Sequence, residues 1–106
     1  MIKVKVYLNQ QNRIVTCEVT GHAGVGAKGY DIVCAGVSAL TQAALLGLMK
    51  HLKVQVAHEV KDGFLSFRLQ EEANELTEAI LQTMTIGLSE IAKAYKENVQ
   101  IEHIRR

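Results

Sequence analysis

Residues 21–40 have the sequence GHAGVGAKGYDIVCAGVSAL, in which a loop leads into an apolar segment. Four of the first ten residues are glycine, so we expect a mobile loop whose backbone can closely approach an extended ligand. Asp31 precedes the apolar run and is predicted to cap a helix. Counted from that cap, Cys34 is the third helical residue, and Ser38 lies one turn above it on the same face. The stretch therefore places a thiol in the first turn of a helix, with His22 in the loop before it.

The predicted helix continues to His51 and is apolar on nearly all sides, which is typical of a helix that is covered on more than one side. We expect the sheet on one side, and either a second helix or another subunit on the other. Lys50 and His51 end the helix, where positive charge suits the helix dipole. Polar and small residues interrupt residues 32–49, so this stretch is predicted to be too mixed and too short to span a membrane.

Sequence patterns on both sides of this stretch predict the remaining elements. Apolar residues from Leu76 to Tyr95 recur every three or four positions and predict a second helix, with Glu78 among its outward positions. Alternating apolar residues predict strands, β-branched residues predict the strand at residues 13–20, and Lys61-Asp62-Gly63 is typical of a hairpin turn. The predicted strands are residues 2–8, 13–20, 54–60, 64–69 and 99–104, and the second helix is residues 71–98. The order ββαββαβ predicts an α+β fold, a two-layer sandwich of two helices on a mostly antiparallel sheet, formed by one domain of residues 1–106.

Two residues in the predicted strands carry groups that are often functional. Cys17 falls inside the second strand, where we expect a buried structural thiol. His58 shares a strand face with Val54, Val56 and Val60, so we expect it to be partly buried. The sequence around His58 offers no partner for catalysis, and we assign this residue no role.

The composition favours a folded cytoplasmic protein. Hydrophobic residues make up 48% of the 106 residues and charged residues 22%, which is enough to build a core. The formal net charge is +1 and no basic run is present, so direct nucleic-acid binding gains little electrostatic support. The first eight residues alternate between apolar and charged side chains, unlike a signal peptide. The two cysteines are expected to be free thiols, because their spacing fits neither a CxxC redox pair nor a zinc knuckle.

The junction between loop and helix carries candidate chemistry. Unpaired N–H groups at a helix start favour a thiolate at Cys34, and a nearby His22 imidazolium favours it further. The same N–H groups can bind a developing oxyanion, and Asp31 is either a cap alone or a group that orients His22. Two alternatives stay open. Cys34 is a core cysteine, or it belongs to a zinc site for which the sequence offers only three ligands, His22, Asp31 and Cys34. The glycine spacing matches neither phosphate-binding pattern, and we expect no metal and no cofactor.

Two motifs resemble the ribosomal-processing cysteine protease family, called Prp. They are Gly-His-Ala at residues 21–23, and GYDIVCA at residues 29–35 followed by VSAL at residues 37–40. The likeness extends over almost the whole chain in length, element order and the acidic start of the second helix. The family often has an alanine where this chain has Gly36, which is a small departure.

The resemblance implies a cytoplasmic endopeptidase that uses a Cys–His dyad. Its implied substrate is the precursor of large-subunit ribosomal protein L-twenty-seven, from which the family removes a short N-terminal extension ending in aromatic residues. Matched position by position, the nucleophile falls on Cys34 and the base on His22. Gly21, Asp31 and Ser38 match further motif positions, with supporting or substrate-binding roles. The family is homodimeric, which agrees with the apolar first helix.

Two functions from other classes remain as alternatives. A non-catalytic ribosome-associated binding module would bind in a strongly salt-dependent way, which the near-neutral charge does not favour. A thiol redox sensor would need a resolving thiol near Cys34, and Cys17 is poorly placed in the middle of a strand.

Overall fold

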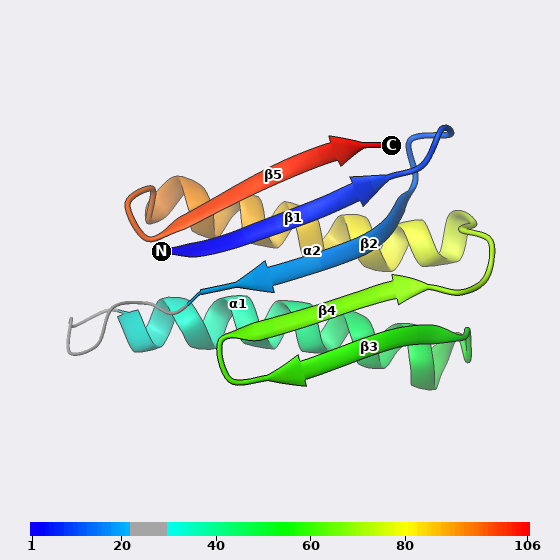
Figure 1. Ribbon diagram of the computed structural model, residues 1–106, viewed down its shortest axis with the longest axis horizontal. Coiled ribbons are helices and arrows are strands. Elements are labelled where there is room, and N and C mark those ends of the chain that lie inside the picture. The colour runs from blue at the N-terminus through cyan, green and yellow to red at the C-terminus, as the bar shows by residue number, and fades with distance from the viewer. Residues whose placement is uncertain (22–29) are drawn as a thin grey trace.

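The computed structural model describes residues 1–21 and 30–106, and for Tyr30 and Asp31 the backbone alone. Five strands form one sheet, and two helices cover one of its faces (Figure 1). The elements are β1 Ile2–Leu8, β2 Ile14–Thr20, α1 Tyr30–Leu46, η1 Gly47–His51, β3 Val56–Lys61, β4 Phe64–Leu69, α2 Glu75–Ala94 and β5 Val99–Arg105. The predicted order ββαββαβ and the two-layer α+β fold are confirmed, and η1 is a single π-helical turn that extends α1.

The sheet has the strand order β3-β4-β2-β1-β5. All neighbouring strands are antiparallel except β1 and β5, which pair in parallel from Ile2 and Val99 onward. The two hairpins, β1–β2 and β3–β4, are joined edge to edge through β2 and β4. As a result, the end of β2 and the β3–β4 turn lie at the same end of the molecule as the start of α1 (Figure 1).

The core lies between the sheet and the two antiparallel helices. Val4, Val6 and Phe67 point from the sheet into this layer and are at most 1% exposed. The helices cross closely at glycines: a Cβ at Gly87 would lie 2.9 Å from Leu40 Cδ1, and a Cβ at Gly36 would lie 3.2 Å from Ile91 Cδ1. Larger side chains at the two glycines would therefore force the helices apart or shift their neighbours.

Several element boundaries differ from the sequence predictions. Helix α1 begins at Tyr30, so Asp31 is its second residue and does not cap it; an acidic residue in the first turn still suits the helix dipole. Helix α2 begins at Glu75, because the side chain of Asn74 accepts hydrogen bonds from two backbone N–H groups and closes a capping box. Strand β3 begins at Val56, two residues later than predicted.

Four side-chain predictions in the scaffold were wrong. Leu76 and Tyr95 were expected on the buried side of α2 but are 63% and 41% exposed, because they lie at the two ends of the helix. Glu78 was expected to face solvent, but its Oε1 accepts the Ile14 N–H (2.8 Å) and so links α2 to the start of β2. His58 is exposed, because β3 is an edge strand with no neighbour beyond it.

The apolar segment that includes α1 is longer and more hydrophobic than expected. Within the described part of the chain, Ile32–His51 has the length and composition of a membrane-spanning helix, with a mean hydropathy of 1.9 over its most apolar window. The prediction that this stretch is too short and too mixed was therefore wrong. A core helix passes the same test, and Val33, Val37 and Leu48 of this segment pack in the core.

Candidate active site

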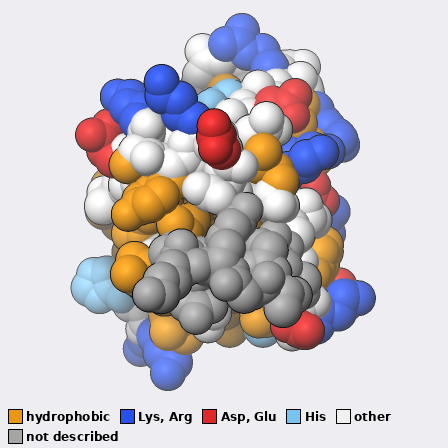
Figure 2. All heavy atoms as spheres, turned by 90° about the vertical axis from the view of Figure 1, so that its left-hand side faces the viewer, with side chains coloured by type: hydrophobic (Ala, Val, Ile, Leu, Met, Phe, Trp, Pro, Cys, Tyr) orange, Lys and Arg blue, Asp and Glu red, His pale blue; other side chains and the backbone are white. Residues whose placement is uncertain are grey.

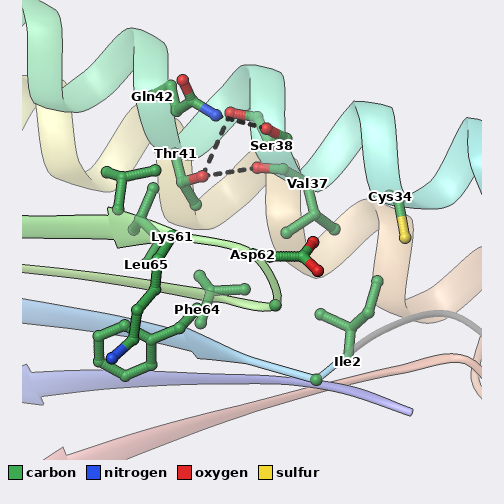
Figure 3. A pocket seen from close by; sticks show the side chains of 14 residues that line it. Ile2, Cys34, Val37, Ser38, Thr41, Gln42, Lys61, Asp62, Phe64 and Leu65 are labelled. Carbon is green, nitrogen blue, oxygen red and sulfur yellow. Dashed lines mark hydrogen bonds between the residues drawn. The ribbon is translucent and has the colours of Figure 1, made fainter.

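A cleft opens between α1 and the β3–β4 hairpin at the end of the sheet (Figure 3). Its volume is about 260 Å³, and residues of β1 and β2 form its floor. The lining residues are Ile2, Val19, Gly21, Cys34, Val37, Ser38, Thr41, Gln42 and residues 60–65. Figure 2 views this end of the molecule, where hydrophobic side chains gather on the surface with charged side chains around them.

Cys34 is a free, half-buried thiol that lines this cleft. It is the fifth residue of α1, two positions further into the helix than the third position predicted from sequence. The N–H groups without an intrahelical partner belong to the first four residues, so the Cys34 N–H is not one of them. The helix start therefore lies next to the thiol, and donors for an oxyanion have to come from the turn before it.

Ser38 and Gln42 continue the α1 wall of the cleft from Cys34. Gln42 Nε2 donates a hydrogen bond to Ser38 Oγ (2.6 Å), which fixes both side chains on the same side of the helix (Figure 3). The Thr41 hydroxyl is buried and donates to the Val37 carbonyl (2.8 Å). This wall therefore presents the mutually hydrogen-bonded Ser38 hydroxyl and Gln42 amide beside an apolar surface. Such a combination suits contact with a peptide backbone.

Gly21 connects the floor of the cleft with the β3–β4 turn. Its φ is +97°, a conformation that residues with a side chain rarely adopt, and a Cβ here would lie 2.2 Å from the Met1 carbonyl oxygen. Its N–H donates to the carbonyl of Gly63 in the turn (3.0 Å). The local backbone conformation therefore requires glycine at position 21. Gly21 also lines the cleft, as expected for a residue of the site.

The remaining predicted site groups lie outside the described residues. These are His22, which follows Gly21 directly in the sequence, and the side chain of Asp31. The pairing of His22 with Cys34, and the contact between Asp31 and His22, stay predictions. In the described part of the chain, no group of three or more His, Cys, Asp or Glu side chains could hold a metal ion.

Cys17 is the second thiol and lies outside the cleft. It is fully buried in the core, and burial raises its pKa to about 12. A thiol with such a pKa stays protonated at neutral pH and is a poor nucleophile. The prediction of a structural role is therefore confirmed.

Comparison with known proteins identifies the family. The model of the cysteine protease Prp family matches residues 1–100. The chain belongs to the Prp family of cysteine proteases. The *Staphylococcus aureus* (strain NCTC 8325) ribosomal processing cysteine protease Prp is 31% identical over 106 residues, covering 97% of this chain and 99% of the relative. The *Bacillus subtilis* Prp is 26% identical over 107 residues, covering 95% and 96%.

Solved structures of a Prp protein agree with the fold and with peptide hydrolysis. The crystal structure of *S. aureus* Prp with a substrate peptide has a TM-score of 0.88 and 28% identity, covering 97% of this chain and 99% of that one. The structure of *S. aureus* Prp with a covalently linked product peptide has a TM-score of 0.87 and 30% identity, with the same coverage. The predicted family and enzyme class are confirmed, and this chain is a cysteine protease.

The opposite wall of the cleft was not predicted from the sequence. The sequence predicted only a turn at residues 61–63, and only buried strand positions at Ile2 and Val19. In the structure all of these residues line the cleft, and residues 61–63 face Cys34 across it. The Asp-Gly pair predicts the turn itself but not its neighbours. Only the pairing of β2 with β4 brings this turn to the start of α1, and sequence alone did not reveal that pairing.

Proposed function

We propose that this protein is an endopeptidase that removes the N-terminal extension of the precursor of large-subunit ribosomal protein L-twenty-seven. The observation that carries the proposal is the half-buried Cys34 thiol, which opens into a cleft that can hold peptide. The family membership supports thiol chemistry, and the name of the *S. aureus* relative supports a ribosomal substrate. We expect this reaction in the cytoplasm, where the free thiols stay reduced.

The proposed mechanism is acyl transfer. His22 takes the thiol proton, and the Cys34 sulfur attacks the scissile carbonyl carbon. First-turn N–H groups of α1 stabilise the oxyanion, and the His22 imidazolium returns its proton to the leaving amine as the C–N bond breaks. Water activated by His22 then hydrolyses the thioester and releases the acid. The covalently linked product peptide in *S. aureus* Prp supports a route through an enzyme-bound peptide.

The length of the α1 wall determines how many substrate residues can lie against it. Cys34 and Gln42 are eight residues apart, which corresponds to about 12 Å along a helix. An extended peptide advances about 3.3 Å per residue, so roughly four residues on one side of the scissile bond would lie against this wall. We therefore expect short generic peptides to be cleaved poorly, because they leave part of the cleft empty.

A mass-spectrometric experiment tests the mechanism. The precursor is mixed with the enzyme, quenched in acid, and the intact enzyme is weighed. The wild type should gain, on Cys34, the mass of the released extension less one water, as expected for a thioester, and His22→Ala should show neither this adduct nor product. Cleavage that proceeds in His22→Ala at the wild-type rate would overturn the dyad.

A homodimer is the second part of the proposal. One side of α1 exposes a stripe with large side chains at its ends, Ile32 (71% exposed) and Leu46 (48%), and with Ala35, Ala39 and Ala43 between them. The stripe is symmetric in size about Ala39, so a two-fold axis there would place Ile32 of one copy against Leu46 of the other. Ala39→Glu would place two like charges at the axis and should give monomers by sedimentation. Dimers that persist in this variant exclude this interface.

A redox sensor is the alternative that shares the reactive thiol. Oxidant should then change the mass of Cys34 reversibly in the absence of substrate, and precursor should remain uncut. Cys17 is fully buried, which does not support a resolving role. A binding module would bind the precursor equally well after alkylation of Cys34.

A further inference from the structure

We propose that the substrate peptide adds a strand to the open edge of β3, and this rests on the function proposed above. Strand β3 lies at one edge of the sheet, and in the described part of the chain no strand pairs with its other side. Figure 1 shows that β3 ends where α1 begins, at the end of the molecule that carries the cleft. An unpaired strand edge can bind an extended peptide through main-chain hydrogen bonds.

The hydrogen bonds of the β3–β4 hairpin show which backbone groups of β3 face outward. In antiparallel strands, residue pairs that exchange hydrogen bonds alternate with pairs that do not. The Gln70 N–H donates to the Gln55 carbonyl (2.9 Å) just before β3 begins, and the register is unbroken through the strand. The odd-numbered residues of β3 therefore bond to β4. The N–H and C=O groups of Val56, His58 and Val60 point away from the sheet.

The edge of β3 continues the cleft that contains Cys34. Val60 lines this cleft and is 51% exposed, although its side chain is apolar. The edge from Val60 back to Val56 is about 14 Å long, close to the length of about 12 Å for the α1 wall between Cys34 and Gln42. Because α1 leads away from the cleft end of the molecule and β3 leads toward it, both surfaces extend from the thiol in the same direction (Figure 1). One segment of roughly four residues can therefore contact both.

The other edge strand, β5, has no such connection with the cleft. It lies at the opposite edge of the sheet, and no residue of β5 is among the described residues that line the cleft. The Arg106 N–H donates to the Leu8 carbonyl (3.1 Å), so the even-numbered residues of β5 bond to β1 and the His103 N–H points outward. Each edge thus has an exposed histidine whose N–H faces away from the sheet, His58 in β3 and His103 in β5. The second edge is a matched control for the first.

Pairing with β3 would fix the register of the substrate relative to Cys34. Every second substrate residue would exchange hydrogen bonds with the edge, whatever its side chain, and the side chains on one face of the added strand would point toward the α1 wall. The loss of one such hydrogen bond should lower binding and kcat/KM about three- to tenfold.

The first experiment removes one outward N–H from each edge. His58→Pro and His103→Pro each remove a donor that the sheet does not use, at a position where an edge strand tolerates proline. His58→Ala and His103→Ala remove the same side chains but keep the N–H. The value of kcat/KM is measured for a peptide spanning the precursor cleavage site, and urea unfolding checks that each variant is folded.

His58→Pro should be about three- to tenfold slower than His58→Ala, and the two variants of His103 should cut equally fast. Peptides shortened from either end then separate recognition from damage to the hairpin. Removing the substrate residue opposite His58 should abolish the difference between proline and alanine there, whereas a distorted hairpin would slow cleavage of every peptide. Equal rates for the two variants of His58, an equal loss at His103, or a difference that persists on the shortest cleaved peptide overturns the proposal.

The second experiment leaves β3 unchanged and so decides the question even if His58→Pro does not fold. Each backbone N–H of the peptide is methylated in turn, and binding to Cys34→Ala is measured by fluorescence anisotropy. A strand paired with β3 should lose affinity at every second residue on one side of the scissile bond. Uniform sensitivity along the peptide, or none, overturns the added strand.

Binding also keeps this proposal separate from the proposed function. Alternating sensitivity in a peptide that the wild type does not cut would leave the β3 edge as a peptide-binding site and end the cleavage assignment. Cleavage of a peptide that shows no alternation would support the proposed function and exclude the added strand.

Discussion

Cys17 lies in the middle of β2 with no exposed surface, whereas Cys34 lies on α1 and opens into the cleft. The first is surrounded by the core, and its pKa is raised to about 12 by burial. The second is half-buried next to the start of a helix. The contrast shows that the position of a thiol on the fold, and not its presence in an apolar segment, decides whether it is accessible from the cleft.

Replacing each cysteine should separate the two roles most strongly. Cys34→Ala should lower precursor cleavage about a thousandfold or more, because the nucleophile is lost, with little change in the free energy of unfolding. Cys17→Ala should cost about 1 kcal/mol of stability but leave kcat/KM within about twofold of wild type. Cleavage kinetics and urea unfolding of both variants measure this. If Cys17→Ala abolishes cleavage while folded, the contrast between the thiols is wrong.

Gly21→Ala should show how strongly the stability of the protein depends on glycine at the floor of the cleft. The new Cβ would lie 2.2 Å from the Met1 carbonyl oxygen, at a φ of +97°. We expect a loss of about 3 kcal/mol or more in the free energy of unfolding. Gly36→Ala is the matched control, because its Cβ meets only the end of the Ile91 side chain, at 3.2 Å. Equal stability of the two variants would contradict the described backbone at Gly21.

Alkaline pH should destabilise the protein through Cys17. The pKa of the thiol is raised from its ordinary value of 9.0 in the unfolded chain to about 12 in the folded protein, so the stabilisation is complete below pH 9 and is lost as pH rises toward 12. At pH 10.5 the loss in the free energy of unfolding is about 2 kcal/mol. Urea unfolding of wild type and Cys17→Ala at pH 8 and 10.5 should show a smaller decrease for the variant. A parallel decrease in both would exclude Cys17 as the cause.

Asn74→Ala should give the smallest effect and serves as a reference for both thiols. It removes the α2 cap, which is remote from the cleft, and should cost about 1 kcal/mol. In the folded variant, the rate of Cys34 alkylation by iodoacetamide should be unchanged. A large change in that rate would mean that reactivity follows global stability and not the local position of the thiol.

The sequence alone predicted the architecture because each element carried a clear period. Alternation marked β1, β-branched residues marked β2, and the Asp-Gly pair marked the β3–β4 turn correctly. The helix ends were less accurate: an aspartate suits both a cap and a first turn, so the predicted start of α1 was two residues too late, and Cys34 is its fifth residue instead of its third. Asn74 lies between two polar stretches, which hid the true start of α2.

Half of the candidate site was predicted and half was not. The thiol, the glycine before His22 and the hydroxyl of Ser38 lie in one contiguous stretch, where composition and motif are visible. Asp62 comes from a hairpin that follows much later, and only the pairing of Cys17 with Phe67 and of Thr20 with Phe64 brings it across from Cys34. Local patterns do not encode such partners, because strand order is set by the whole core.

The hydrogen bond from the Gly21 N–H to the Gly63 carbonyl has a mechanical consequence. It couples the turn that lines the cleft to the strand end that leads into His22, so strain at one is transmitted to the other. A poorly fitting substrate would then be penalised in turnover more than in affinity. Retargeting the enzyme by exchanging its hairpin would have to preserve that one carbonyl, or the new specificity would come with a stalled catalyst.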